Sequence, residues 1–260
     1  MNKITTLFIC MLLMQYSYAQ DIENLSYPEI DSLLNLHESN QEYDKGISLS
    51  LEASKKSDKQ DSLCGEYLEW AAYLYQHSGN KDKAIEYYNK TLTVFANTLG
   101  KNTARYATTL SFFAKHRKDM GDYEEALPLY SQAKNIREKV LGLEHPQFVN
   151  SLHNLAFLHE AMGNYEKALP LFIQTKNINE KIYGVEHPEF ASSLNNLAVL
   201  HYQMGNYEKA LPLYIQAKNI REKKMGVEHP KFAESLNNLA ALHYQMGNYE
   251  KALPLYIQAK

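Results

Sequence analysis

The chain has 260 residues, of which 45% are hydrophobic, so it can form a packed core and is not a disordered chain. Its 27 basic and 30 acidic residues give a formal net charge of -3. This balance excludes the strongly basic surface that binds nucleic acids or anionic membranes, and we expect no nucleic-acid partner.

The first predicted element is a leader at residues 1–19. Lys3 provides a positive start, residues 4–14 are mostly apolar, and the small residues Ser17 and Ala19 precede a cleavage point. This layout is typical of a signal peptide, and the apolar run is shorter than the about 20 residues of a membrane-spanning helix. We therefore expect export (periplasmic, cell-envelope or secreted) with no membrane insertion after cleavage. A retained membrane anchor is the alternative.

Residues 20–58 contain one degenerate helical repeat. Tyr43, Gly46 and Ile47 match later copies, whereas Gln41 occupies the position that holds glycine in those copies. Beyond this segment, Cys64 is the one cysteine left after leader removal, and we expect its thiol to be buried.

Residues 59–260 are predicted to form an array of about five repeats, the last incomplete. Residues 184–218 and 226–260 align without gaps and differ at only three positions. The period is marked by glycines placed 42 residues apart: Gly79, Gly121, Gly163, Gly205 and Gly247. Self-similarity at a fixed period of this length indicates stacked supersecondary units.

Each repeat carries two helical patterns. In the fifth, His187 stands at the expected N-cap and Pro188 at the first helical position, where proline is well tolerated. Gly205 ends this helix, and we expect Asn206 to cap the second. Pro212 lies inside the second helix, where we expect a slight bend.

The pattern resembles the tetratricopeptide repeat. Its signature positions are occupied by Leu194, Leu197, Ala198, Gly205, Tyr207 and Ala210. The period, the LNNLA core and the EHP connection are similar to the variant found in kinesin light chains and in bacterial repeat proteins. The resemblance implies an all-α fold, a right-handed α-solenoid of antiparallel helix pairs. Its concave groove would bind a protein or extended peptide segment.

At 100° per residue, one side of each repeat's first helix lies next to its apolar stripe. This side matches the positions that line the groove in the family. The candidate groove residues are Asn150, His153, Glu160, Ser192, Asn195, Asn196, Val199, Tyr202, Glu234, Asn237, Asn238 and Tyr244. An Asn amide both donates and accepts, so it can hold an extended backbone without reading its sequence. The alternative is that the Asn side chains bond a neighbouring repeat.

Two of the three differences between the near-identical repeats lie on this flank, Ser192 against Glu234 and Val199 against Ala241. One interpretation is a groove that varied to suit a partner. The other is that exposed residues drift while core residues do not.

No catalytic, metal or cofactor site is predicted. The EHP triplet recurs once per repeat, and its His and Glu suggest metal or acid–base chemistry. The copies stand in separate connections, however, and a helix start explains the His-Pro pair. Helical spacing places three further histidines on the apolar, core-facing side of the first helix of their repeats: His159, His201 and His243.

Two functional hypotheses remain. The chain is either a stand-alone exported binding protein or the N-terminal docking arm of a larger protein with a downstream CHAT-type peptidase or signalling kinase domain. The last copy matches its predecessor up to Lys260 and stops inside the second helix. Because solenoids need polar terminal units, we expect a longer reading frame.

Overall fold

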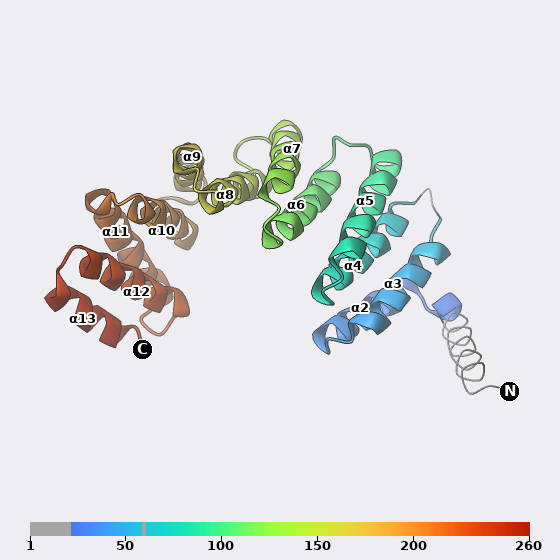
Figure 1. The fold of residues 1–260 in the computed structure, drawn as a ribbon, viewed down its shortest axis with the longest axis horizontal. Helices are drawn as coiled ribbons and strands as arrows, with labels where there is room; N and C mark the ends of the chain where they lie inside the picture. Colours follow the sequence, from blue (N-terminus) through green and yellow to red (C-terminus); the bar gives the residue numbers. More distant parts are fainter. Residues whose placement is uncertain (1–21, 59–60) are drawn as a thin grey trace. The chain divides into compact units, whose positions relative to one another are not determined.

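A computed structural model describes residues 22–58 and 61–260, so the predicted leader lies outside the described residues. The chain forms two compact units, residues 1–116 and 117–260, which are described separately. All regular structure in the described residues is helical, and successive helices form pairs (Figure 1). We call the first helix of each pair helix A and the second helix B. The predicted all-α solenoid of helix pairs is confirmed.

The described part of the first unit contains two complete pairs. They are α2 (Tyr27–Ser39) with α3 (Tyr43–Lys56) and α4 (Ser62–His77) with α5 (Lys81–Thr98), followed by α6 (Ala104–Asp119), which runs across the boundary. The degenerate repeat predicted at residues 20–58 contains the helix pair α2 and α3. In its turn Gln41 adopts φ 59°, the left-handed conformation that glycine takes in the later turns.

Apolar side chains of α2, α3 and α4 form one cluster in this unit. Ile30, Leu34 and Leu74 have no exposed surface, and Tyr67 is 1% exposed. The buried Cys64 also lies on α4, as expected from its apolar surroundings. Helix packing is close enough at Gly65 that an added Cβ would collide with the ring of Phe95.

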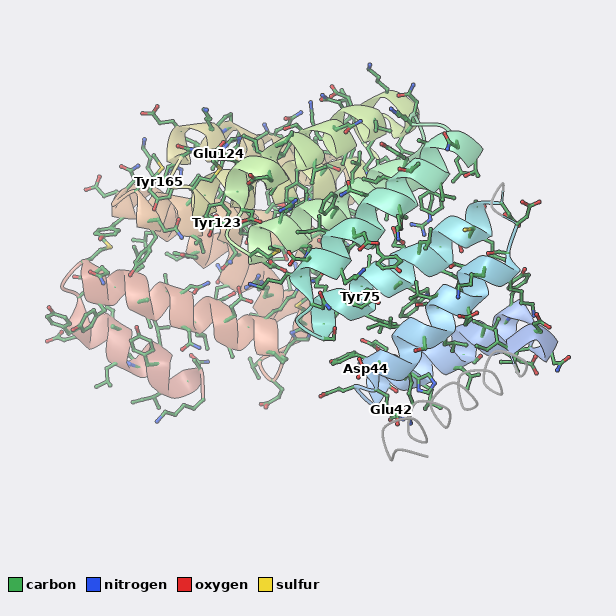
Figure 2. All side chains as sticks on the ribbon, turned by 45° about the vertical axis from the view of Figure 1, so that its right-hand side comes forward. Glu42, Asp44, Tyr75, Tyr123, Glu124 and Tyr165 are labelled. Carbon is green, nitrogen blue, oxygen red and sulfur yellow. The ribbon has the colours of Figure 1, made fainter. Side chains whose placement is uncertain are left out.

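The second unit continues the same pairing. Its helices are α7 (Tyr123–Leu141), α8 (Pro146–Ala161), α9 (Tyr165–Tyr183), α10 (Pro188–Gln203), α11 (Tyr207–Met225), α12 (Pro230–Gln245) and α13 (Tyr249–Gln258). A tyrosine begins each of the B helices here, and Figure 2 labels Tyr123 with its neighbour Glu124 on α7 and Tyr165 on α9. An acidic residue in the first turn suits the positive end of the helix dipole.

The turn residues explain where these helices begin and end. Gly205 has φ 74° and Gly226 has φ 87°, so the predicted glycine breaks are confirmed. Asn206 is the N-cap of α11, as predicted, but its side chain makes no cap hydrogen bond. Its backbone carbonyl accepts from Lys209 and Ala210 instead. Pro212 lies within α11, as expected.

Two core clusters of the second unit join neighbouring repeats. Ala198 on α10, Tyr214 on α11 and Leu242 on α12 belong to one cluster, in which Leu242 is fully buried. A helix pair therefore completes its core only with the next helix A, as expected for a solenoid. Tyr214 is 3% exposed, whereas its counterpart Tyr256 on α13 is 39% exposed.

Candidate functional site

The predicted groove residues of the second unit lie on three A helices. α8 carries Asn150, His153 and Glu160; α10 carries Ser192, Asn195, Asn196, Val199 and Tyr202; α12 carries Glu234, Asn237, Asn238 and Tyr244. Four of them are exposed, namely Asn150, Glu234, Asn237 and Tyr244. Asn195 is buried, and the other seven are partly buried. We call this set the A-helix face.

Asn amides on this face bond neighbouring repeats. Asn238 Nδ2 donates to Asn195 Oδ1 at 3.0 Å, which joins α12 to α10. Asn195 Nδ2 in turn donates to Glu234 Oε1 at 3.3 Å. Asn195 is only 3% exposed, so its amide is used inside the array. These contacts favour the stacking alternative for Asn195 and Asn238; a peptide contact by either residue stays a prediction.

A second link joins α8 to α10. Asn196 Nδ2 lies 2.6 Å from His153 Nε2, and because an amide nitrogen can only donate, the ring nitrogen accepts. The His153 ring also packs edge-on against Phe157, with centroids 4.3 Å apart. Burial lowers the pKa of His153 to about 4, so the ring is neutral at neutral pH.

Glu160 and Gln203 form a third link between the same helices. Gln203 Nε2 donates to Glu160 Oε1 at 2.8 Å. Burial raises the pKa of Glu160, and the Gln203 hydrogen bond opposes part of this effect. Its Oε2 atom is buried with no hydrogen-bond partner in the described part of the chain. Glu160 therefore contributes a carboxylate that is costly to ionise.

The difference between Ser192 and Glu234 changes a contact between repeats. Ser192 Oγ donates to Pro188 O within its own helix at 3.0 Å. Glu234 accepts from Asn195 and lies 3.7 Å from Arg221 Nη1. Glu234 thus has a structural role, whether or not it also contacts a partner.

Aromatic side chains mark the exposed end of this face. Tyr202 and Tyr207 have ring centroids 5.6 Å apart, and 42 residues later Tyr244 and Tyr249 repeat the pair at 5.2 Å. Tyr244 is 55% exposed and Tyr249 is 61% exposed. Tyrosine pairs of this kind offer a large, rigid contact area with hydrogen-bonding ends.

The EHP triplets are helix starts. His145, His187 and His229 are N-caps whose Nδ1 atoms each accept from the backbone N–H two residues later, at 3.1 Å. Glu186 pairs with Lys223 and Lys224 across a repeat, and these lysines lower its pKa. Within residues 22–58 and 61–260, no three His, Cys, Asp or Glu side chains come together as a metal site.

The core histidines are packed, as predicted. His159 and His243 are buried, and His201 is partly buried. Burial lowers the pKa of each, and a lysine eight residues later on helix B adds to the effect. Their Nδ1 atoms have no hydrogen-bond partner among the described residues. They are therefore neutral core residues.

A cavity of about 550 Å³ in the first unit lies outside the predicted groove residues. Helix α4 lines it with Trp70, Tyr73 and His77, while Glu38 of α2 and Phe112 of α6 complete its walls. The sequence carries a signal for this cavity. Three ring-bearing residues at steps of three and four share one helix face, in a chain that has only one tryptophan.

The tetratricopeptide repeat family model matches residues 65–139, 106–181, 147–223 and 189–260, a continuous run over most of the chain. The chain belongs to the tetratricopeptide repeat family. As a tetratricopeptide repeat array it is a protein-interaction scaffold, a fold that is typically non-catalytic. The chain has no significant match among curated proteins.

Solved tetratricopeptide repeat structures are similar over most of their length. A putative kinesin light chain with nearly identical TPR-like repeats from Podosopora anserina is 28% identical, with a TM-score of 0.66, over 75% of this chain and 92% of that one. BtubC (BKLC) from P. vanneervenii is 23% identical, with a TM-score of 0.71, over 83% and 87%. Pseudomonas aeruginosa pilF is 18% identical, with a TM-score of 0.60, over 92% and 91%. The last two show the fold alone.

Proposed function

We propose that the A-helix face of the second unit binds an extended segment of a partner protein. The observation that carries this proposal is the exposed aromatic end of the face, where Tyr244 is 55% exposed on α12, the helix that also carries the exposed Asn237. Aromatic rings supply contact area at low entropic cost, and an exposed amide can hold a peptide backbone. The family membership of the chain supports the same role.

A peptide selection tests this proposal. Dodecapeptides selected from a phage-displayed random library against the purified chain should bind the A-helix face. Replacing both Tyr202 and Tyr244 by Ala should weaken a selected peptide about tenfold or more, because aromatic anchors dominate such interfaces. Ile215→Ala is the control, since this side chain is 41% exposed on helix B. Equal affinities for the double variant and the parent would refute the proposal.

The place of action is proposed to lie outside the cytoplasm. The support is the leader layout of residues 1–19. Among the described residues, no helix combines the length and hydropathy required to cross a bilayer. N-terminal sequencing of the tagged protein from a bacterial host should begin at Gln20, and a chain that still begins at Met1 would contradict cleavage of the leader.

A second candidate is a docking arm of a larger protein with a CHAT-type peptidase or signalling kinase domain. It is favoured by the exposed apolar side chains of α13, where Leu253 and Ile257 are each 63% exposed. In the preceding repeat the counterpart of Leu253, Leu211, packs against the cluster that α12 completes, whereas the counterpart of Ile257, Ile215, stays 41% exposed. Sequencing the reading frame past codon 260 tests this candidate, and an immediate stop codon would contradict it.

A further inference from the structure

The cavity of the first unit has the size of a ligand site. Its volume of about 550 Å³ lies within the roughly 300–1,000 Å³ of typical ligand pockets. Its lining comes from the A helices α2, α4 and α6, with α5 beneath. It is therefore distinct from the A-helix face of the second unit.

Aromatic rings form two walls of this cavity at a right angle. The Trp70 and Tyr73 rings are 5.8 Å apart and inclined by 89°, and Tyr73 also packs on His77 with centroids 4.3 Å apart. Phe112 on α6 also lines the cavity and is 46% exposed. Faces arranged in this way attract cations, and guanidinium groups stack on them well.

The two carboxylates of the cavity are not equivalent. Both oxygens of Glu69 already have a donor, because Arg105 Nη2 donates to one at 2.7 Å and Thr109 Oγ1 donates to the other at 2.5 Å. Glu38 accepts one hydrogen bond, from Tyr73 Oη to Oε1 at 2.9 Å. In the described part of the chain its Oε2 atom accepts none, so Glu38 keeps an acceptor and a negative charge for a ligand.

Tyr73 fixes that carboxylate in place. Burial, followed by the hydrogen bond to Glu38, raises the pKa of Tyr73 to about 12, so its hydroxyl stays protonated and donates. Lys115 is the cation among the lining residues, and it lies on α6, whereas Glu38 lies on α2. A positively charged ligand group is therefore drawn to the α2 side of the cavity.

From these contacts we infer that the cavity binds an arginine side chain of a partner protein segment, with the guanidinium on Trp70 and Tyr73 and paired with Glu38. An apolar side chain would take the Glu38 carboxylate out of water without a partner, which is unfavourable. An arginine satisfies the carboxylate and the rings together. The inference rests on the proposed function only in that its occupant is a protein segment.

Trp70 makes this inference directly measurable, because it is the only tryptophan of the chain. The full chain is titrated with the peptide acetyl-Gly-Ser-Arg-Ser-Gly-amide and with a twin in which citrulline, the uncharged isostere, replaces arginine. Trp70 fluorescence should change saturably with the arginine peptide and should require about tenfold more of the citrulline peptide, as for the loss of one charge-assisted contact.

Variants separate the role of Glu38 from general charge. Glu38→Gln should weaken the arginine peptide about tenfold, whereas Glu66→Gln, an exposed carboxylate on α4 outside the cavity lining, should leave its affinity unchanged. Circular dichroism confirms that both variants are folded. Equal affinities of the two peptides, no change in Trp70 fluorescence, or an unaffected Glu38→Gln variant would each overturn the inference.

The two proposals can fail separately. If Trp70 fluorescence does not respond while library peptides still require Tyr202 and Tyr244, the arginine site is wrong and the proposed function stands. If Trp70 fluorescence responds and the Tyr202 and Tyr244 double variant binds library peptides normally, the arginine site stands and the proposed function is wrong.

Discussion

Asn238 Nδ2 donates to Asn195 Oδ1 across 3.0 Å and thereby joins α12 to α10. Asn195 and Asn237 occupy the same position of successive repeats, yet Asn195 is buried and Asn237 is exposed. The same residue type therefore stabilises the stack in one repeat and faces solvent in the next.

Asn195→Ala should lower the free energy of unfolding by about 1–3 kcal/mol, because it leaves Asn238 and Glu234 without a buried partner. Asn237→Ala is the matched control and should change stability by less than about 0.5 kcal/mol. Urea unfolding followed by circular dichroism measures both. Similar losses for the two variants would mean that the bond between α10 and α12 contributes little.

Arg221 forms a buried joint between helix B and the next helix A. Its side chain is 2% exposed, and Nη1 donates to Ser235 Oγ at 2.8 Å and to Lys231 O at 3.0 Å. One repeat earlier, Asn179 Nδ2 donates to Ser193 Oγ at 2.7 Å in the same position.

The Asn179–Ser193 hydrogen bond suggests asparagine as a replacement for Arg221. Arg221→Ala should cost about 1–3 kcal/mol, since it removes a buried, hydrogen-bonded side chain and leaves the Ser235 hydroxyl without its donor. Arg221→Asn should cost clearly less, because it reproduces the Asn179 arrangement. Thermal unfolding of the two variants gives the comparison, and an equal loss would show that the asparagine does not reach Ser235.

His153 should make the stability of the array depend on pH. Its folded-state pKa of about 4 lies below the ordinary value of 6.5, so the unfolded chain binds the proton more tightly. The contribution of the neutral ring is complete above pH 6.5 and is lost as the pH falls towards 4. The loss amounts to at most about 3 kcal/mol.

His153→Asn isolates this effect, since asparagine occupies the same position in the next two repeats, at Asn195 and Asn237. Between pH 7 and pH 4 the parent should lose stability relative to the variant, as measured by urea unfolding at each pH. Parallel stability curves for the two proteins would contradict the assigned pKa.

Gln41 adopts φ 59° in the turn between α2 and α3, where the later repeats have glycine. Gln41→Gly should raise the free energy of unfolding by roughly 0.5–1 kcal/mol, because glycine takes this conformation without steric cost. Asn40→Gly is the control, since Asn40 has φ -85° and gains no such relief. A calorimetric melting temperature that falls in both variants would contradict the expectation.

Repeating features of the fold could be predicted from sequence, and neighbour-dependent ones could not. Glycine spacing and the His-Pro pairs determine local backbone geometry, so the helix starts at His187 and the breaks at Gly205 follow directly. The burial of Asn195 does not, because a helical projection treats α10 alone whereas α12 covers that flank. Asn206 is the N-cap of α11, but its side chain does not bond the helix, since a residue type that favours capping does not guarantee a side-chain hydrogen bond.

The cavity around Trp70 escaped prediction for a related reason. The cavity depends on α2, which belongs to the degenerate first repeat. The spacing between this repeat and the next differs from the 42 residues of the later repeats. The ring spacing on α4 is readable from the sequence, but the position of Glu38 opposite those rings follows only from the packed helices.

Photo-crosslinking tests the central claim, that the A-helix face binds an extended protein segment, most directly. p-Benzoylphenylalanine is placed at Tyr244, at Tyr202 or, as a control, at Ile215 on helix B, and each protein is irradiated with a library-selected peptide. Crosslinked peptide is expected from the two tyrosine positions, and little from Ile215. Crosslinking mainly from Ile215, with none from Tyr202 or Tyr244, would place the partner on the B helices and contradict this claim.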